Sequence, residues 1–569
     1  MARRIEKWLI PPIIFAAVVF LVGINWGLPS RKVDPFLFGD HPVWSGKEIA
    51  QLLGNRGSLS MGADVDANPN RLRPMVLNDT DEKRAEIVAR YRLYSYQPDE
   101  MITFRALSTI PQTHGDPRLY QYGGLWVYPV GVLLKIASVV GVVELRSSVE
   151  FYLDHPEQFG RFYLIARLYV FAWAMVGVWA VFWLAKKMTG DRVVAMLAAI
   201  AYAAMPVVIN MAHEAKPHLP GVVLMLLAVM AGVKYVETSS RRWAVGAGAL
   251  CGAAFGMVLT GVLAFILLPI MCFLRWRAKS PLAPSRFFRA LIDCILATLA
   301  GALVYSITNP FVVLHLLGDR EVLFSNLQNT QAMYRELIQP DTLLGAAKLI
   351  AMGATPALAV LGAAAILFAP RKQDIARKLM LGVAVLVLVQ FVMLSMDKPG
   401  EYARFGIFLD IALMLLGFGA IGSVVTHPKI RWAVLGVLCA ITMVWTAGYV
   451  WHFTNDSLER TSRMIIAKRL QETFDRGARE LAIYNDPAPY CLPPVDLFKW
   501  KMVLVDSGGA PTRSTDVLIR PIDSIPKQDT PMLDFEVVYW TRPRLLDTPI
   551  SWAAKPFRVL VRKGYVETN

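Results

Sequence analysis

Long apolar stretches recur along the chain, separated by short polar segments. A run of about 20 apolar residues is what an α-helix needs to cross a hydrocarbon core about 30 Å thick. The strands of a transmembrane barrel would instead alternate apolar and polar residues over about ten positions. Eleven long stretches begin near Trp8, Ile165, Val193, Gly221, Trp243, Gly261, Phe287, Leu343, Leu379, Phe405 and Trp432. The pattern predicts an α-helical polytopic membrane protein with about 11 transmembrane helices, none of them broken.

Lys and Arg are unevenly distributed between the short loops. Loops that carry an excess of these residues stay in the cytoplasm. With a cytoplasmic N-terminus, the basic residues of the inner loops include Arg3, Arg4, Lys7, Lys186, Lys187, Arg192, Lys234, Arg241, Arg242, Arg275, Arg277, Arg371, Lys372, Lys429 and Arg431. The short outer loops hold little beyond Lys216, Lys398 and Arg404. Because the number of spans is odd, we expect the C-terminus outside.

The apolar stretch Leu125–Val143 would invert every later loop if it crossed the membrane. We therefore expect a juxtamembrane helix that lies in the outer interface. Trp126, Tyr128 and the pair Tyr120 and Tyr122 would be its aromatic anchors.

Two polar regions are far longer than a connector of about 2 to 8 residues. They are the first outer loop, residues 28–163, and the tail, residues 456–569. The tail opens with a helical pattern over Leu458–Leu481 and continues in four short strand-like runs. These runs are 502–505, 516–519, 535–539 and 557–561. We expect a transmembrane module over 1–455, which includes the loop 28–163, and a small extracytoplasmic α/β domain over 456–569.

The composition agrees with a membrane protein. Hydrophobic residues make up 55% of the chain and charged residues 18%, with a mean hydropathy of +0.43. A soluble protein carries about a quarter charged residues. The net charge of +15 comes mostly from basic residues that flank the spans, so no nucleic-acid partner is expected. The five cysteines form no disulfide framework or metal motif.

Two adjacent carboxylates, Asp99 and Glu100, follow Pro98 in the first outer loop. The residue before a proline favours an extended conformation, so the pair should lie where a loop passes into the helix predicted over Met101–Ile110. One interpretation is that the pair caps this helix. The other is that one carboxylate is a general base at the membrane surface, where partial desolvation favours proton acceptance.

The segment before the fourth span concentrates ionisable residues between two apolar stretches: His213, Glu214, Lys216 and His218. Ionisable groups at such a depth are costly and indicate a site. Three interpretations stay open. The two His and the Glu could bind a metal, Lys216 could neutralise a phosphate, or the segment could be a solvated turn.

Other cations lie at the predicted outer boundary. Arg167 is three residues into the second span, where it either pairs with a carboxylate of the first outer loop or faces an anionic ligand. Lys398 and Arg404 flank the start of the tenth span, and Arg404 could also snorkel to lipid headgroups. His315 belongs to a polar stretch after the seventh span that either roofs a cavity or is a plain loop.

Several short motifs occur in a recognisable order. They are the basic N-terminus with the first span, Pro-Asp-Glu at 98–100, Gly-Asp-Pro-x-x-Tyr-x-Tyr-Gly-Gly at 115–124, Ala-Arg-Leu at 166–168, Asn-Pro-Phe at 309–311, Lys-x-x-x-Tyr-x-Arg at 398–404 and Pro-Ile-Ser-Trp-Ala-Ala-Lys-Pro-Phe at 549–557. In this order the chain resembles the multi-spanning C-type glycosyltransferases. That family includes the protein O-mannosyltransferases and the aminoarabinose transferases of lipid A, and the later motifs resemble its bacterial members.

The resemblance implies an inverting enzyme of a bacterial plasma (inner) membrane. Its donor would be a sugar on a polyprenyl phosphate, and its acceptor a hydroxyl of a protein, lipid or glycan at the outer face. Asp99 matches the catalytic carboxylate and Glu100 its neighbour. Arg167 matches the arginine at the start of the second span. From the charges at the outer boundary we expect a donor site that comprises Arg167, His213, Lys216, His218, Lys398, Tyr402 and Arg404. Fixed cations there would stabilise the charge that grows on the leaving phosphate.

The chain departs from the family pattern at two places. About 60 residues, roughly 33–92, separate the first span from the acidic motif and leave room for an acceptor-specific insertion. Lys216-Pro-His218 stands where many members have an acidic residue, which puts a second acid in doubt. Asp64 and Asp66 have the Asp-x-Asp form, but their Gly, Asn and Pro neighbours indicate a turn. We therefore expect metal-independent chemistry without a cofactor.

Two other classes of function stay open. A transporter or lipid flippase for an anionic substrate would suit eleven spans with outer cations, although such proteins usually have paired repeats or broken midplane helices. A scaffold that recruits partners would explain the tail but not the acidic motif.

Overall fold

The computed structural model describes residues 6–54, 75–277, 284–332, 340–368, 374–394, 400–458, 460–474, 479–485, 487–505, 514–521, 535–540 and 548–563. The chain divides into two compact units. Unit 1 comprises 1–22, 102–133 and 166–450, and unit 2 comprises 23–101, 134–165 and 451–569. The structure thus groups most of the first outer loop with the tail, whereas the sequence analysis placed that loop in the transmembrane module.

Nine of the eleven apolar stretches, all but those near Ile165 and Trp432, lie on helices of unit 1 alone. These helices are α1 (Ile10–Leu21), α9 (Arg192–Ala204), α10 (Pro206–Ala212), α11 (His218–Thr238), α12 (Arg241–Met257), η4 (Leu259–Ile266), α13 (Leu267–Arg277), α14 (Pro284–Thr308), α15 (Pro310–Leu317), α16 (Arg320–Ala332), α17 (Pro340–Ala354), α18 (Pro356–Phe368), α19 (Ile375–Leu394), η5 (Gly400–Gly406) and α20 (Ile407–Val424). Four further helices contain a unit boundary: α5 (Glu100–Thr109), α6 (Gly124–Val139), α8 (Pro156–Thr189) and α21 (Pro428–Ser457).

Within the described residues, seven helices are long and apolar enough to cross a membrane, or up to nine if each of two bent helix pairs is one span. The chain is therefore a multi-pass integral membrane protein. Two of the predicted spans are shorter helices, Lys7–Leu21 and α12, which has 17 residues. The ambiguous stretch is the 16-residue helix α6, about 24 Å long, which is shorter than a hydrocarbon core of about 30 Å.

Two of the predicted spans are broken, and the expectation of unbroken helices was wrong. The axis bends by 60° between α9 and α10 and by 112° between α17 and α18. Pro206 and Pro356 open the second helix of each pair. Proline has no N–H and disfavours the helical conformation in the residue before it. Thr355, directly before Pro356, has a φ of +86°, which a β-branched residue rarely adopts.

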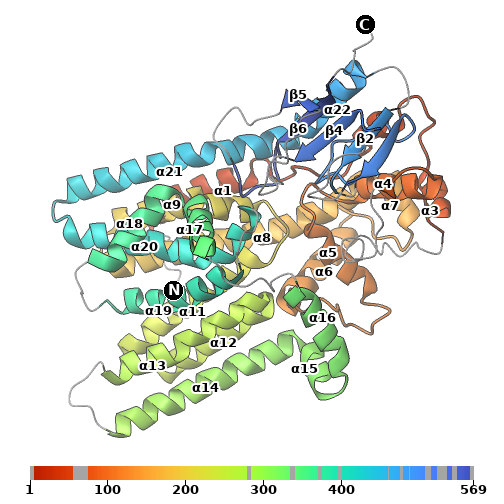
Figure 1. Ribbon diagram of the computed structural model, residues 1–569. Coiled ribbons are helices and arrows are strands. Elements are labelled where there is room, and N and C mark those ends of the chain that lie inside the picture. The colour runs from red at the N-terminus through yellow and green to blue at the C-terminus, as the bar shows by residue number, and fades with distance from the viewer. Residues whose placement is uncertain are drawn as a thin grey trace. The chain divides into compact units, whose positions relative to one another are not determined.

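Small residues set the closest helix packing in unit 1. Helices α12 and α14 run side by side (Figure 1). A Cβ at Gly248 would collide with the carbonyl of Ala297, and one at Gly252 would collide with that of Gly301. Such small-residue contacts let helix backbones approach closely.

Ion pairs join the N-terminal segment and two of the predicted inner loops in unit 1. Glu6 binds both Lys186 at 2.9 Å and Arg192 at 3.0 Å. Asp191 binds Arg431 at 2.6 Å. The orientation of the helices in the membrane stays a prediction.

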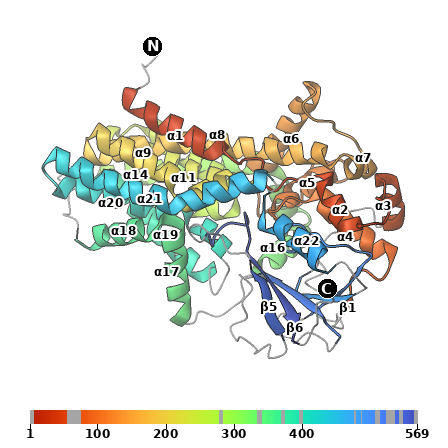
Figure 2. The same ribbon diagram turned by 90° about the horizontal axis from the view of Figure 1, so that it is seen from above.

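Unit 2 contains a six-stranded mixed sheet and several short helices. The helices are α2 (Asp34–Phe38), α3 (Gly46–Leu53), α4 (Asp81–Leu93), α7 (Val149–Asp154) and α22 (Ser462–Thr473). The strands are β1 (Met75–Val76), β2 (Arg479–Ile483), β3 (Trp500–Leu504), β4 (Val517–Pro521), β5 (Phe535–Trp540) and β6 (Phe557–Arg562), in the order β1-β3-β2-β4-β6-β5. Strand β2 is parallel to β3 and β4, whereas β5 and β6 form an antiparallel pair that Figure 2 shows side by side.

The four strand-like runs predicted in the tail correspond to β3, β4, β5 and β6. The helix predicted over Leu458–Leu481 was wrong at its C-terminal end, because α22 ends at Thr473 and Arg479 begins β2. The residues Leu481 to Ile483 are buried between two parallel neighbours, and such strands are apolar on both faces. Their short apolar run therefore resembles part of a helix.

The orientation is tested with cysteine probes in whole cells. All five native cysteines are buried or partly buried, so an added exposed cysteine dominates labelling. We expect an impermeant thiol reagent to label Lys468→Cys in α22 of intact cells, and to label Arg242→Cys at the start of α12 only after lysis. The reverse pattern would contradict the predicted orientation.

Candidate functional site

The two adjacent carboxylates lie in unit 2, in the turn between α4 and α5. Glu100 begins α5 and is fully buried, and its Oε2 accepts a hydrogen bond of 2.5 Å from the Ser95 hydroxyl. Asp99 is half-buried, and its backbone N–H donates to Gln97 Oε1 at 3.0 Å. The turn therefore holds Glu100 inside and leaves part of the Asp99 side chain exposed.

A buried ion pair organises the segment between α10 and α11 in unit 1. The Lys216 ammonium lies 3.3 Å from Glu214 Oε2, and both side chains are almost fully buried. The Asn210 amide donates to Glu214 Oε1 at 2.9 Å. The positive charge of Lys216 is thus already balanced by a carboxylate.

His213 is buried in the same segment. Its ring nitrogens lie 2.8 Å from the Ile209 carbonyl and 2.9 Å from the Val22 carbonyl. Burial lowers the pKa of His213 to about 4, and the nearby charge of Arg167 on α8 acts in the same direction. Both ring nitrogens face backbone carbonyl oxygens. The place of His213 in the donor site stays a prediction.

Arg404 lies against two aromatic rings of its own element, η5, and further rings from two other segments of unit 1 adjoin them. Its guanidinium carbon is 5.1 Å from the Tyr402 ring centre and 5.0 Å from that of Phe405. The His218 ring lies 5.3 Å from Phe405 and 5.8 Å from Tyr122. We call these five residues the Arg404 cluster. The structure thus brings together three of the predicted donor-site residues: His218, Tyr402 and Arg404.

The glycines of the 115–124 motif place Tyr122 in the Arg404 cluster. The Gly123 N–H donates to the Met257 carbonyl at 3.1 Å, and the Gly124 N–H donates to Asn309 Oδ1 at 2.8 Å. A Cβ at either glycine would collide with a backbone carbonyl. The motif is therefore tied to the C-terminal ends of α12 and α14, and Asn309 of the Asn-Pro-Phe motif supplies one of these bonds.

A pair of a buried Asp and a partly buried His in unit 1 was missed by the sequence analysis. Asp116 Oδ2 lies 2.9 Å from His315 Nε2 and accepts a hydrogen bond of 2.9 Å from the Tyr120 hydroxyl. Asp116 is 3% exposed. The sequence could have pointed to Asp116 as a candidate site residue, because Asp116 lies inside the 115–124 motif. Within the described residues, no group of three or more His, Cys, Asp or Glu side chains could hold a metal ion.

The remaining predicted residues are placed as follows. Arg167 is fully buried on α8 of unit 1. Lys398, Asp64 and Asp66 lie outside the residues that the structure describes.

Residues 159–305, from α8 to α14, match the model of the dolichyl-phosphate-mannose-protein mannosyltransferase family. This match confirms the resemblance drawn from the motifs. No curated protein matches the chain.

Two solved structures are similar at low identity. ArnT from Cupriavidus metallidurans, bound to undecaprenyl phosphate, is 13% identical over 98% of each chain, with a TM-score of 0.39. The archaeal oligosaccharyltransferase AglB from Archaeoglobus fulgidus, in complex with an inhibitory peptide and a dolichol-phosphate, is 11% identical over 90% of this chain and 69% of its own, with a TM-score of 0.40. At these identities and TM-scores the two structures support no conclusion about this chain. The family match over residues 159–305 therefore supports the class of enzyme.

The ion pair Glu214–Lys216 is tested by unfolding. Lys216→Met leaves Glu214 buried without its counter-charge, and breaking a buried pair costs about 3 to 5 kcal/mol. We expect that loss in the free energy of unfolding of the purified protein. The double variant Glu214→Gln/Lys216→Met should recover most of it. Equal stabilities of the single and double variants would show that the pair does not hold this segment.

Proposed function

We propose that the chain is a C-type glycosyltransferase, which takes a sugar from a polyprenyl phosphate and transfers it with inversion to an acceptor hydroxyl at the outer face of the membrane. The family match over residues 159–305 supports this class of enzyme. Asp99 is the general base and Arg404 the principal contact of the donor phosphate. The observation that carries this proposal is the difference between the two neighbouring carboxylates: Glu100 is fully buried and Asp99 is half-buried.

Asp99 has the chemistry that an inverting transfer needs. A carboxylate that accepts the proton of the acceptor hydroxyl makes the oxygen a better nucleophile as it attacks the anomeric carbon. The C–O bond to the phosphate breaks as the new bond forms, and the electron pair leaves with the phosphate. Glu100 is bound to Ser95, so it holds the turn rather than meeting the acceptor.

Arg404 suits the leaving phosphate. A guanidinium stays charged and offers paired N–H donors that match phosphate oxygens. The rings of Tyr402 and Phe405 flank it, and cations against aromatic faces keep a defined position. Lys216 is balanced by Glu214, so it contributes as half of a dipole. Arg167, His213, His218 and Lys398 complete the proposed donor site.

We infer from the basic loops that the Arg404 cluster lies at the outer face of the membrane. The ion pairs of Glu6 and Asp191 join the N-terminal segment and two of the basic loops. The Arg404 cluster comes from loops that alternate with them along the chain. Positive loops are retained in the cytoplasm, so this cluster faces outward in a bacterial plasma membrane.

The acceptor is a hydroxyl of a protein, lipid or glycan, and we assign its recognition to unit 2. A pocket of about 280 Å³ there is lined by aromatic and charged side chains, among them Lys32, Tyr94, Tyr96, Arg161 and Asp456. Tyr96 is three residues before Asp99. Rings together with charges of both signs suit a polar acceptor such as a sugar or a peptide.

The role of Asp99 is tested by Asp99→Asn. Asn caps a helix about as well as Asp, so the fold should be retained. The amide cannot accept a proton, and loss of a general base costs about 10²- to 10⁴-fold in rate. We expect that loss in the transfer of labelled sugar from a polyprenyl-phosphate donor. Glu100→Gln, the neighbouring control, should lose less, and a well-folded Asp99→Asn protein with near-normal transfer would contradict the assignment.

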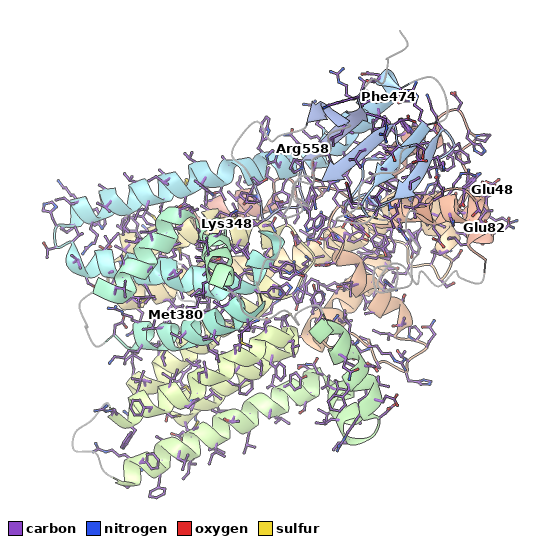
Figure 3. All side chains as sticks on the ribbon, in the orientation of Figure 1. Glu48, Glu82, Lys348, Met380, Phe474 and Arg558 are labelled. Atoms are coloured by element: carbon purple, nitrogen blue, oxygen red, sulfur yellow. The ribbon has the colours of Figure 1, made fainter. Side chains whose placement is uncertain are left out.

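The role of Arg404 is tested by donor binding. Arg404→Gln removes a charge-assisted contact, so the affinity for a polyprenyl phosphate should fall about 10- to 100-fold and become less salt-sensitive. Lys348→Gln is the control, because Lys348 is an exposed cation of unit 1, labelled on α17 in Figure 3. Unchanged affinity in Arg404→Gln would mean that Arg404 only anchors η5.

A further inference from the structure

Asp410 is a buried carboxylate within a membrane span. It lies on α20, inside the candidate span Tyr402–Val424, and is 1% exposed. Neither of its carboxylate oxygens has a hydrogen-bond partner among the described residues. Asp293, another acid buried within a span, instead binds Arg241 at 2.7 Å and the Tyr235 hydroxyl at 3.1 Å.

The Asp410 carboxylate faces the break between α17 and α18. A Cβ on Gly353, in the last turn of α17, would collide with Asp410 Oδ2. Two residues later the chain turns by 112°, at Thr355, whose φ is +86°. Thr355 is 1% exposed, and its hydroxyl also has no partner among the described residues. Two buried polar side chains without partners therefore lie at one strained helix break.

No positive side chain of the described residues neutralises Asp410. The elements packed against α20 are α9, α11, α17, α18, α19 and η5. Their described charged or titratable side chains are Arg192, Tyr202, His218, Lys234, Tyr235, Glu237, Lys348, Arg377, Lys378, Tyr402 and Arg404. None of these forms an ion pair or hydrogen bond with Asp410 in the described part of the chain.

We propose that Asp410 and the break between α17 and α18 form a membrane-embedded site for one small monovalent cation, a proton or Na⁺. An isolated carboxylate in an apolar interior is costly, and a single bound positive charge removes that cost. Broken helices free backbone carbonyls at membrane depth, and such carbonyls together with an acidic side chain and a hydroxyl are suitable ligands for these ions. Gly353 supplies the close approach that a larger residue would block.

The proposed cation site is connected to the Arg404 cluster by packed side chains. Helix α17 packs against η5, and its residues Ala346 and Leu349 form one apolar cluster with Phe391, against which Tyr402 and Phe405 pack. A cation that stabilises the end of α17 would therefore also stabilise η5, which carries Arg404. This consequence rests on the proposed function, whereas the cation site itself does not.

The test measures the melting temperature of the purified full chain in lipid nanodiscs. One series replaces choline by Na⁺ at constant ionic strength and alkaline pH, and the other lowers the pH without Na⁺. A ligand that binds only the folded state raises the melting temperature with its concentration. We expect a rise of several degrees in the first series for Na⁺, or in the second series alone for a proton.

Asp410→Asn keeps the shape of the side chain without its charge, and its melting temperature should lose the response seen in the wild-type protein. Asp293→Asn, the matched control, should keep that response because Asp293 has its own partners. Gly353→Ala places a methyl group against the Asp410 carboxylate and should weaken the response of the melting temperature. This variant is measured in place of Asp410→Asn if Asp410→Asn does not fold. Equal responses of wild-type and Asp410→Asn proteins, or no response in either series, would overturn the proposal. Donor affinity is measured separately, so a failure of the donor assignment leaves this result interpretable.

Discussion

A charge among apolar helices must be balanced, because neither lipid nor packed side chains replace the water that it loses. Unit 1 follows this constraint at Glu214–Lys216, Asp293–Arg241 and Asp191–Arg431. These pairs fix loops and helix ends relative to one another.

The apolar spans and the strands of the tail could be predicted because both depend on local patterns. The order of apolar and basic segments predicts the number of helices, and alternation between turns predicts strands. The broken helices were missed although Pro206 and Pro356 stand in the sequence, because proline alone does not distinguish a kink from a break. Strand β2 was missed because a short apolar run has no period of its own.

Contacts between distant segments could not be predicted. Met75 pairs with Leu504, which ties part of the first outer loop to the sheet of the tail. Asp116 and His315 are 199 residues apart. The acidic motif and the outer cations were found from their residue types, but only the structure separates the buried Glu100 from the half-buried Asp99 and the balanced Lys216 from the ring-flanked Arg404. Gly123 and Gly124 act through contacts with the backbone of distant segments, and the pattern of residue types does not predict such contacts.

The roles proposed for Asp99 and Arg404 depend on transfer of a sugar from a polyprenyl phosphate with inversion. The direct measurement incubates the purified chain with a labelled polyprenyl-phosphate sugar and a panel of hydroxyl acceptors, and follows the anomeric signal of the product by NMR. We expect release of polyprenyl phosphate together with a glycoside of the opposite anomeric configuration. A product with retained configuration, or a donor that stays intact with every acceptor class, would contradict it.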